Sequence, residues 1–578
     1  MKKVFKNLFP TSLLLALILW TMPFGFAQNT AAPAAKAAPT EQVSADSLKK
    51  TTDAATTTAV TSAPIAEVAQ TPPAEDKGGL FGLGMAMSIL LVLCLLLVCG
   101  FEFVNGFHDT ANAVATVIYT NTLKPQTAVI WSGLLNFLGV STSVYFFGGK
   151  VAANIINLLP IEVLTQQTVA QCLAMIFALL FSAIIWNVGT WYFGIPASSS
   201  HTLIGSILGV GLGFSYAVGK DSVNWDKAYE MGQSLLISPL AGFLATILLM
   251  LLLRWLVRTP KQKRKEQEAK IQEAIARGEM TEEEAKENEW ANEASIFKGP
   301  KDGKEPPAWI RYVLMFTCSM VSFFHGLNDG QKGVGLMMLI LIGIAPSYFA
   351  IKSDASMAEL SKHLATTNAI IAKIDTNKVA SDQRTKYTKL LTSLNATFAA
   401  NQNSSQIAPE KRFELRKDII LLEKAMKKLP KAEDLGISKE EREKVEKESK
   451  KLRSLTDSAP WWVLGLISVS LGLGTMIGWR RIVVTIGEKI GKNHLSYAQG
   501  AAAEMVAATT IGIASYWGLP VSTTHVLSSG VMGSFVAQRG VRNLNRGTLT
   551  NILLAWVLTL PVTITLAAGL YLLFRAVL

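Results

Sequence analysis

The stretch Asn105-Gly106-Phe107-His108-Asp109-Thr110-Ala111-Asn112-Ala113 places an aspartate among amide, imidazole and glycine residues inside a long apolar segment. An imperfect copy begins 220 residues later as His325-Gly326-Leu327-Asn328-Asp329-Gly330-Gln331-Lys332-Gly333. An ionisable side chain at membrane depth is costly, and such side chains usually serve a function. The glycines predict that the helix is interrupted at each copy, so that freed backbone groups face a ligand. Two copies in one chain indicate a duplicated transporter.

The composition is that of a multi-pass membrane protein. The chain has 578 residues, of which 50% are hydrophobic, and a mean hydropathy of +0.31. Its apolar runs are long enough to cross a hydrocarbon core of about 30 Å. The net charge of +12 lies largely in loops and a polar insertion, so it does not indicate nucleic-acid binding. The four cysteines all lie in apolar segments without metal-ligand spacing, and we expect no fixed structural metal and no cofactor.

Composition changes divide the chain into seven parts. A lysine-rich start, an apolar run and small residues predict a signal peptide, and an Ala-, Thr- and Pro-rich stretch predicts a disordered tether. The parts are the signal peptide (1–27), the extracytoplasmic tether (28–78), a first transmembrane repeat (79–256), a cytoplasmic polar linker (257–308), the start of a second transmembrane repeat (309–345), a polar helical extracytoplasmic insertion (346–458) and the remainder of the second repeat (459–578).

Ten apolar segments make up the two repeats, five in each. The segments are 84–123, 128–147, 168–192, 196–216, 234–256, 309–345, 461–479, 496–517, 519–537 and 549–574. Lysine and arginine clusters after 256, 479 and 537 place those loops in the cytoplasm, so both termini are expected outside it. An odd number of segments per repeat predicts an inverted repeat with a binding site between its halves. In the insertion, 410–429 and 438–455 predict charged helices, and a capping box at 281–284 predicts a short helix in the linker.

A second motif is also duplicated. Gly194-Ile195-Pro196-Ala197-Ser198-Ser199-Ser200-His201-Thr202 returns as Gly518-Leu519-Pro520-Val521-Ser522-Thr523-Thr524-His525-Val526, after 324 residues. The insertion accounts for the larger spacing. Proline suits the first turn of a helix, and hydroxyls at a helix N-terminus favour an anion. The candidate ligands of a tetrahedral oxyanion are Ser198, Ser199, Ser200, Thr202, Ser522, Thr523 and Thr524.

Two aspartates would repel a bound oxyanion unless each carboxylate takes a cation. A proton, sodium or a divalent metal carried with the anion would serve, and oxygen ligands suit the hard cations. The residues that supply these ligands in the two repeats are Asp109, Asn112, Asn328 and Asp329. Coupled cation–anion symport is the hypothesis that uses all these groups.

These four motifs resemble those of the PiT family of inorganic phosphate transporters. The similarity covers roughly 84–256, 309–345 and 460–578, and the motifs occur in the family's order. The resemblance implies an all-α polytopic membrane protein with an inverted repeat, broken helices and two Ser/Thr-rich helical hairpins. It implies secondary symport of inorganic phosphate across the bacterial cytoplasmic (inner) membrane, and no enzymatic activity. Glu504 matches a carboxylate before the second hairpin, which adds it to the cation ligands.

Departures from the sodium-coupled members favour the bacterial branch. His108 stands where those members have asparagine, Asn136 where some have glutamate, and Lys332 adds an ammonium. This branch resembles low-affinity, proton-coupled carriers of metal–phosphate complexes, with Mg²⁺ or another divalent cation. We therefore expect a proton gradient to drive import. The candidates for proton relay or charge balance are His108, His201, His325, Lys332 and His525.

Other interpretations stay open on the residues alone. The aspartates could be structural partners of Lys332 or a histidine, and His201 and His525 could cap helices. Sodium coupling, or transport of sulfate or another oxyanion, fits the same motifs. A hydrolase triad of Ser200, His201 and Asp109 is disfavoured because adjacent residues on a helix point about 100° apart. An envelope sensor built on the insertion is the remaining alternative. Phosphate and the lipid bilayer are the expected partners; a homo-oligomer and an extracytoplasmic partner of the insertion stay open.

Overall fold

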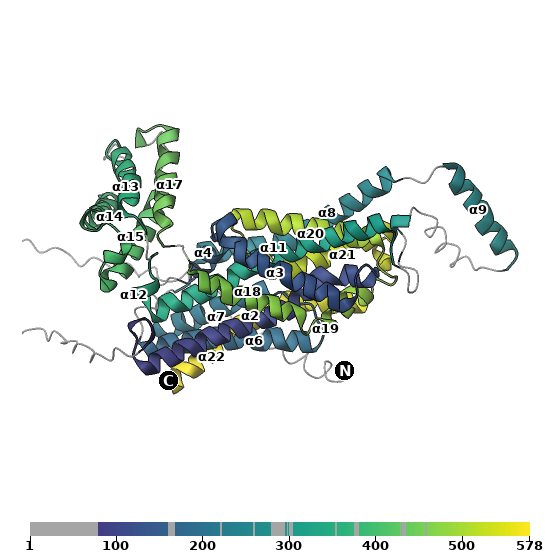
Figure 1. Cartoon of the computed structure of the whole chain (residues 1–578), viewed down its shortest axis with the longest axis horizontal. Helices are drawn as coiled ribbons and strands as arrows, with labels where there is room; N and C mark the ends of the chain where they lie inside the picture. The colour runs from purple at the N-terminus through teal and green to yellow at the C-terminus, as the bar shows by residue number, and fades with distance from the viewer. Residues whose placement is uncertain are drawn as a thin grey trace, which may run out of the picture. The chain divides into compact units, whose positions relative to one another are not determined.

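A computed structural model describes the chain from residue 79 onward with several gaps (Figure 1). The described residues are 79–159, 168–219, 222–257, 261–278, 295–297, 299, 305–352, 355–374, 381–427, 429, 435–456 and 459–578. Met1–Gly78 and Gly79–Leu578 form separate units, and only the second is considered below. The expected signal peptide, the tether and the capping box at 281–284 lie outside the described residues.

Helices form at all ten apolar segments, which confirms those predictions to within several residues at most ends. The first half contains α2 (Met85–Tyr119), α3 (Pro125–Phe147), α4 (Lys150–Ile156), α6 (Val169–Tyr192), α7 (Ser199–Val218) and α8 (Trp225–Leu256). The second half contains α11 (Ala308–Ile344), α18 (Trp461–Met476), α19 (Arg480–Val484), α20 (Tyr497–Trp517), α21 (Thr523–Arg539) and α22 (Arg546–Val577). Single-turn helices are η2 (Leu80–Gly82), η3 (Ser295–Phe297), the π-helical η6 (Thr485–Lys489) and η7 (Val541–Asn543), and the linker contains α9 (Lys261–Ala276).

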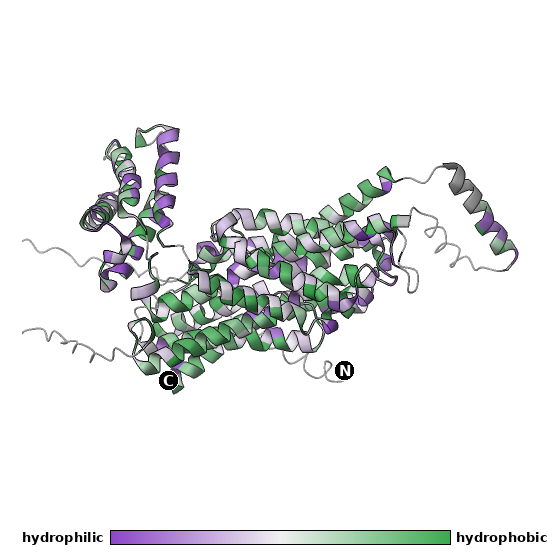
Figure 2. Ribbon diagram, viewed as in Figure 1, coloured by the Kyte–Doolittle hydropathy of each residue, from purple (hydrophilic) through white to green (hydrophobic). Residues whose placement is uncertain are grey.

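Fewer than ten of these helices meet the length and hydropathy of a membrane span. Among the described residues seven do, or eight if the pair Trp461–Met476 and Arg480–Lys489, bent by 54°, is one span. α20 and α21 are not among them, because small and hydroxyl side chains lower their hydropathy and α21 is short. Figure 2 shows hydrophobic residues along the long bundle helices and hydrophilic residues along α17. A simple count of ten crossings is therefore not supported.

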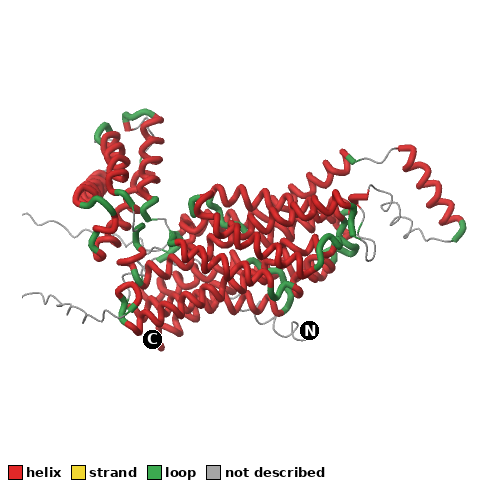
Figure 3. The backbone as a smooth tube through the Cα atoms, in the orientation of Figure 1, coloured by secondary structure: helices red, strands yellow, loops and turns green. Residues whose placement is uncertain are grey.

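Helices of one half pack against helices of the other half. α3 packs on α11 and α18 packs on α2, while α7 packs on α22 and α21 packs on α8. Each of these four contacts joins the two predicted repeats. Short loops connect most neighbouring helices of the bundle (Figure 3). The hydroxyl-rich motifs and the aspartate motifs are thereby brought to the middle of one bundle.

The expectation that the aspartate motifs interrupt their helices is wrong. α2 runs unbroken from Met85 to Tyr119 and α11 from Ala308 to Ile344. The glycines instead permit close helix crossing: a Cβ on Gly106 would lie 2.4 Å from the carbonyl oxygen of Leu471 in α18. A Cβ on Gly326 would lie 2.3 Å from the carbonyl oxygen of Asn136 in α3. Any side chain here would push the two halves apart.

The insertion forms a helical domain with its own hydrophobic core. Its helices are α12 (Pro346–Phe349), α13 (Met357–Ile371), α14 (Ser381–Ala400), α15 (Pro409–Lys427) and α17 (Lys439–Arg453), with η5 (Ser404–Gln406). The two predicted charged helices are confirmed as α15 and α17, and a capping box of Ser438 and Glu441 begins α17. The buried Arg416 donates hydrogen bonds to the carbonyl oxygens of Ala350 and Thr456 and so joins the two ends of the insertion.

Candidate functional site

Two loops reverse the chain at the hydroxyl-rich motifs. α6 ends before Gly194 and α20 before Gly518, whose φ angles of 66° and 79° are in the left-handed region that favours glycine. Ser198 and Ser522 cap the next helices, and their hydroxyls accept hydrogen bonds from the backbone N–H groups three residues on, at 3.2 and 3.1 Å. The prolines therefore lie in the loops and not in the first helical turns, where we expected them.

Asp109 receives hydroxyl groups from both loops. Its side chain is buried on α2, in the last third of the helix. The Oγ of Ser199, at the start of α7, donates to its Oδ2 at 2.8 Å, and the Oγ1 of Thr524, at the start of α21, donates to its Oδ1. One carboxylate thus joins the hydroxyl-rich motif of each half. The sequence predicted all three residues as ligands, and the structure brings them together.

Asp329 lies in α11 and has a different partner. The Nζ of Lys332 is 2.5 Å from its Oδ1, and the Oγ1 of Thr523 donates to its Oδ2 at 3.3 Å. The same ammonium donates to the Oγ of Ser200 at 2.5 Å and to the carbonyl oxygen of Val521 at 2.8 Å. Lys332 therefore neutralises Asp329 and contacts both hydroxyl-rich motifs.

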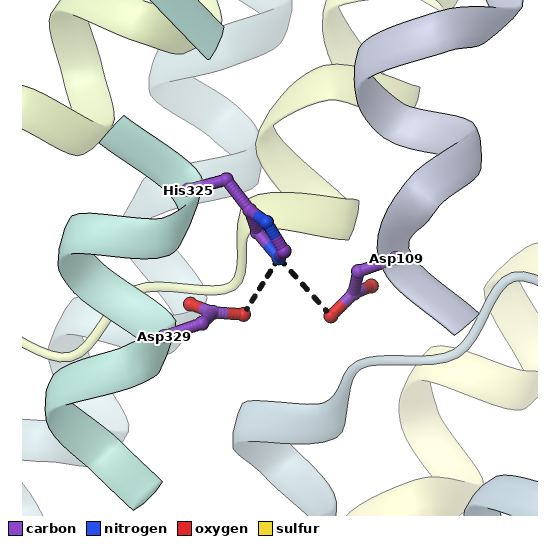
Figure 4. A group of neighbouring side chains, drawn as sticks. All are labelled: Asp109, His325 and Asp329. Carbon is purple, nitrogen blue, oxygen red and sulfur yellow. Dashed lines mark ion pairs between the residues drawn. The ribbon is translucent and has the colours of Figure 1, made fainter. Parts of the chain in front are cut away.

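His325 lies between the two carboxylates (Figure 4). Its Nε2 is 3.7 Å from the Oδ2 of Asp109 and 3.3 Å from the Oδ2 of Asp329. The three side chains can offer one ligand atom each within 4.8 Å of one another. Nitrogen and carboxylate oxygens at this spacing suit a divalent cation or a shared proton.

The tautomer of His325 follows from its other neighbours. The Nδ1 atom is 2.9 Å from the Oδ1 of Asn136, whose Nδ2 donates to the Oγ1 of Thr475 at 2.9 Å. The Thr475 hydroxyl donates to the carbonyl oxygen of Leu471, so it must accept from the amide. The amide oxygen of Asn136 therefore faces His325, and Nδ1 carries a proton. In the neutral imidazole the Nε2 lone pair then points at both carboxylates, an arrangement that a proton or a metal ion would stabilise.

His108 is held in the same manner on the other side of Asp109. Its Nε2 is 3.2 Å from the Oγ1 of Thr190, and that hydroxyl donates to the carbonyl oxygen of Trp186. Nε2 is therefore the donor, and Nδ1 lies 3.8 Å from the Oδ1 of Asp109. A second imidazole nitrogen is thus available to a proton beside this carboxylate.

The two histidines of the hydroxyl-rich motifs pack against each other. The rings of His201 and His525 are 4.5 Å apart between centroids, and His525 stacks on Trp556 at 4.1 Å. The Nδ1 of His201 lies 2.8 Å from the capping hydroxyl of Ser198. Adjacent Ser200 donates to the carbonyl oxygen of Val521, so Ser200 and His201 do not form a hydrolase dyad.

Some predicted ligands have other partners. The hydroxyl of Thr202 donates to the carbonyl oxygen of Ser198 within its own helix. The Nδ2 of Asn328 donates to Ser515 at 2.8 Å and to the carbonyl oxygen of Leu519 at 3.3 Å, which supports the second loop. The side chain of Asn112 lies outside the described residues.

Glu504 lies apart from the carboxylate pair. Its oxygens accept hydrogen bonds from Thr317, at 2.5 Å, and from Thr116. At a rise of about 1.5 Å per residue, Thr116 is ~10 Å from Asp109 along α2, and Thr317 is ~18 Å from Asp329 along α11. A role of Glu504 in the same cation site would need a different arrangement of these helices.

One buried carboxylate in the motif helix itself, Glu102, was not among the predicted site residues. Glu102 is fully buried, and the Nδ2 of Asn105 donates to its Oε2 at 3.3 Å. The rule that singles out Asp109, an ionisable residue inside an apolar run, applies equally to Glu102. The duplication does not single it out, because Ser322 and not a carboxylate stands at the matching position of the second copy.

Comparisons with known proteins identify the family. Residues 105–567 match the profile described as PHO4, "Phosphate transporter family". The chain belongs to this phosphate transporter family. It is similar to "Low-affinity inorganic phosphate transporter PitB" of Escherichia coli (strain K12), at 39% identity over 526 residues, which cover 85% of this chain and 97% of that protein. A "Low-affinity inorganic phosphate transporter" of Buchnera aphidicola is also 39% identical, over 84% of this chain and 96% of its own length.

A solved structure has a fold similar to that of this chain. "The sodium-dependent phosphate transporter" is 19% identical, with a TM-score of 0.51, over 85% of this chain and 100% of that chain. At this identity the likeness shows a common helical architecture alone. Members of the family and the relatives above are transporters, so this multi-pass membrane protein is not an enzyme.

Proposed function

We propose that the chain imports inorganic phosphate together with a coupled cation, by alternating access at the centre formed by Asp109, Asp329 and the two hydroxyl-rich loops. One observation carries the proposal: Asp109 accepts hydrogen bonds from Ser199 of the first loop and from Thr524 of the second. A site made from both halves can open to either side of the membrane when the halves move against each other. The choice of inorganic phosphate as the substrate is supported by the names of relatives that are 39% identical to this chain.

Phosphate would bind at the N-termini of α7 and α21. Each helix directs free backbone N–H groups and a partial positive charge toward the centre, and hydroxyls follow the caps directly. The ammonium of Lys332 adds a full charge beside Ser200. In the geometry described, Ser199 and Thr524 donate to Asp109, Thr523 donates to Asp329, and Ser200 donates to the carbonyl oxygen of Val521. Rotation about χ1 would redirect these hydroxyls to phosphate oxygens.

Charge balance then requires the coupled cation. Lys332 compensates one of the two aspartates, and a phosphate dianion adds two further negative charges. Like charges about 4 Å apart repel by roughly 4 kcal/mol at an effective dielectric constant of about 20. Protons on His325 or His108, or a divalent metal carried with the phosphate on Asp109, His325 and Asp329, would remove this repulsion. A metal ion in this scheme is part of the cargo.

The topology proposed with this function is an inverted repeat in the bacterial inner membrane, with both termini outside the cytoplasm. The packing between the halves supports this topology. α3 packs on α11 as α18 packs on α2, and α7 packs on α22 as α21 packs on α8. Equivalent helices of the two halves thus make equivalent contacts across their boundary. Arginine and lysine clusters follow α8, α18 and α21. Positive loops favour the cytoplasmic side, so these clusters support termini outside the cytoplasm.

Gradient-driven uptake tests the proposal. Purified protein in proteoliposomes is given labelled phosphate under a proton gradient or a sodium gradient, each with and without Mg²⁺. We expect accumulation under the proton gradient, faster with Mg²⁺. Acceleration by sodium alone would overturn proton coupling and make the aspartates sodium ligands. Absence of phosphate accumulation under every gradient would overturn the proposed function.

A further inference from the structure

Glu102 is a buried carboxyl group that the proposed phosphate site does not use. It lies seven residues before Asp109 in α2, on the same side of the helix as Asn105 and Asp109. Among the described residues its Oε1 has no hydrogen-bond partner, and its Oε2 accepts only the long bond from Asn105. The Oδ1 of Asn105 also lacks a partner there. A carboxylate ion in such surroundings is strongly disfavoured, whereas a neutral carboxylic acid is tolerated.

The carboxyl group lies where α2 meets α11. A Cβ on Gly333 would lie 2.4 Å from Oε1, so only glycine leaves room for this side chain. Gly333 directly follows Lys332 and is one turn beyond Asp329. The charged groups that act on the Glu102 carboxyl are Asp329, Lys332 and His325, all of α11. α3, α6 and α18, which also pack on α2, contain no Asp, Glu, Lys, Arg or His. Other elements that contact α2 are α7, α19, η6, α20 and α21, and their Asp, Glu, Lys, Arg and His residues are His201, Arg480, Arg481, Glu488, Lys489, Glu504, His525 and Arg539.

The second repeat does not need a carboxyl group at this position. The residue 220 positions after Glu102 is Ser322, whose hydroxyl donates to the carbonyl oxygen of Cys318 and lies 2.9 Å from Ser132. Packing at the equivalent place is thus satisfied by a small, hydrogen-bonded side chain. A buried acid with one weak hydrogen bond has no comparable structural role in the first repeat.

We propose that Glu102 carries the coupling proton of phosphate symport, taking it up on the extracytoplasmic side of Asp109 and releasing it to the cytoplasm after phosphate has left. This inference rests on the proposed function. The step forms an O–H bond at the carboxylate from a water-borne proton and breaks it by transfer back to water, so no other reactant is needed. Glu102 is neutral while phosphate occupies the site. When the empty site turns back toward the extracytoplasmic side, Glu102 has already released its proton.

Substitution of Glu102 separates coupling from substrate binding. Glu102→Gln keeps the shape and the hydrogen-bonding capacity of the neutral acid but cannot release a proton. We expect proton-gradient-driven phosphate accumulation to fall at least tenfold and its pH dependence to flatten. Exchange of labelled for unlabelled phosphate, measured without any gradient, should persist. Glu102→Asp should recover part of the gradient-driven accumulation, and Ser322→Ala at the equivalent position should leave coupling as in the wild type.

Two results would overturn the role of Glu102. One is accumulation by Glu102→Gln at the wild-type level with a wild-type pH profile. The other is loss of phosphate exchange along with accumulation in Glu102→Gln, which would make Glu102 a packing or substrate residue. Failure of the wild-type protein to move phosphate in any assay would instead contradict the proposed function itself.

Discussion

Asp109 and Asp329 occupy equivalent positions in the two halves, yet they are compensated in different ways. Asp329 is 2.5 Å from the ammonium of Lys332, three residues later in its own helix. Asp109 accepts hydroxyl groups from Ser199 and Thr524, and its motif has Asn112 where the second has lysine. One carboxylate is thus neutralised within its helix, while the other joins loops from both halves.

The difference shows how a duplicated motif can be divided between two tasks. An ammonium fixed beside Asp329 supplies permanent positive charge where an anion would bind. Hydroxyl groups leave Asp109 able to take a proton or a metal ion, because they satisfy its oxygens without cancelling its charge. His325 lies between the two and can share a proton or a ligand bond with either.

The largest expected effect is loss of transport when either carboxylate is removed. Asp109→Asn and Asp329→Asn should each lower phosphate uptake into proteoliposomes by more than 100-fold, because the cation loses a ligand and the hydroxyls lose their acceptor. Membrane insertion and elution as a folded species serve as controls. Wild-type uptake by either variant would remove that carboxylate from the mechanism.

The ion pair of Asp329 and Lys332 is expected to matter next for stability. Lys332→Met leaves a buried carboxylate without its counter-charge, and breaking such a pair typically costs about 3–5 kcal/mol. Its apparent Tm in detergent should therefore fall well below that of the wild type. The double variant Asp329→Asn with Lys332→Met should recover most of this loss. An unchanged Tm for Lys332→Met would show that Lys332 does not neutralise Asp329.

Single hydroxyl deletions should have smaller, unequal effects on uptake. A hydrogen bond to a charged group contributes about 1.5–3 kcal/mol, so Ser199→Ala and Thr524→Ala should each reduce uptake at least about tenfold. Thr523→Ala should reduce it only about two- to threefold, since its bond to Asp329 is 3.3 Å long and Lys332 remains.

Two serines on the same helices provide matched controls. Among the described residues, the hydroxyls of Ser206 in α7 and Ser528 in α21 are buried and have no hydrogen-bond partner. Ser206→Ala and Ser528→Ala should keep uptake within about twofold of the wild type. Equal losses in these controls and in the loop variants would show a general packing effect.

The smallest expected effect concerns the insertion and its acid sensitivity. Burial raises the pKa of Glu448, but hydrogen bonds from Lys451 and His363 outweigh this effect and hold the pKa below its ordinary value. A depressed pKa means that Glu448 stabilises the folded domain above the ordinary glutamate pKa of about 4.3 and loses this effect as the pH falls below it.

Hydrogen exchange of the full-length protein measures this contribution. After correction for intrinsic rates, protection of α13 and α17 should decrease below about pH 4.3 in the wild type. Glu448→Gln should lower protection slightly at neutral pH and weaken the acid dependence. Identical profiles for the two proteins would contradict a stabilising role of Glu448. Unchanged protection of α2 and α11 would show that the effect is confined to the insertion.

Much of the fold and the centre of the site could be predicted from the sequence. The length of apolar runs indicated the helices, and two duplicated motifs indicated that their polar residues meet. Continuity of α2 and α11 could not be predicted, because Gly106 and Gly326 are compatible with a break or with close packing. Only the partner helix, α18 or α3, decides between them.

Side-chain contacts that depend on the rotation of a helix about its axis also could not be predicted from the sequence. Glu504 is an ionisable residue in an apolar run like the aspartates, but its rotation on α20 turns it toward Thr317 and Thr116. Lys332 contacts both Asp329 and Ser200 only because the first turn of α7 lies within reach of the Lys332 side chain. Side-chain partners across halves are set by packing, which a motif alone does not specify.

Phosphate exchange by the wild-type protein tests the central claim most directly. Proteoliposomes loaded with unlabelled phosphate are placed in labelled phosphate with no ion gradient, and uptake of label is followed with and without excess sulfate. The account predicts rapid, saturable entry of label that unlabelled phosphate suppresses and sulfate does not. Absence of phosphate exchange, or suppression by sulfate as strong as that by phosphate, would contradict a phosphate site at Asp109, Asp329 and the two loops.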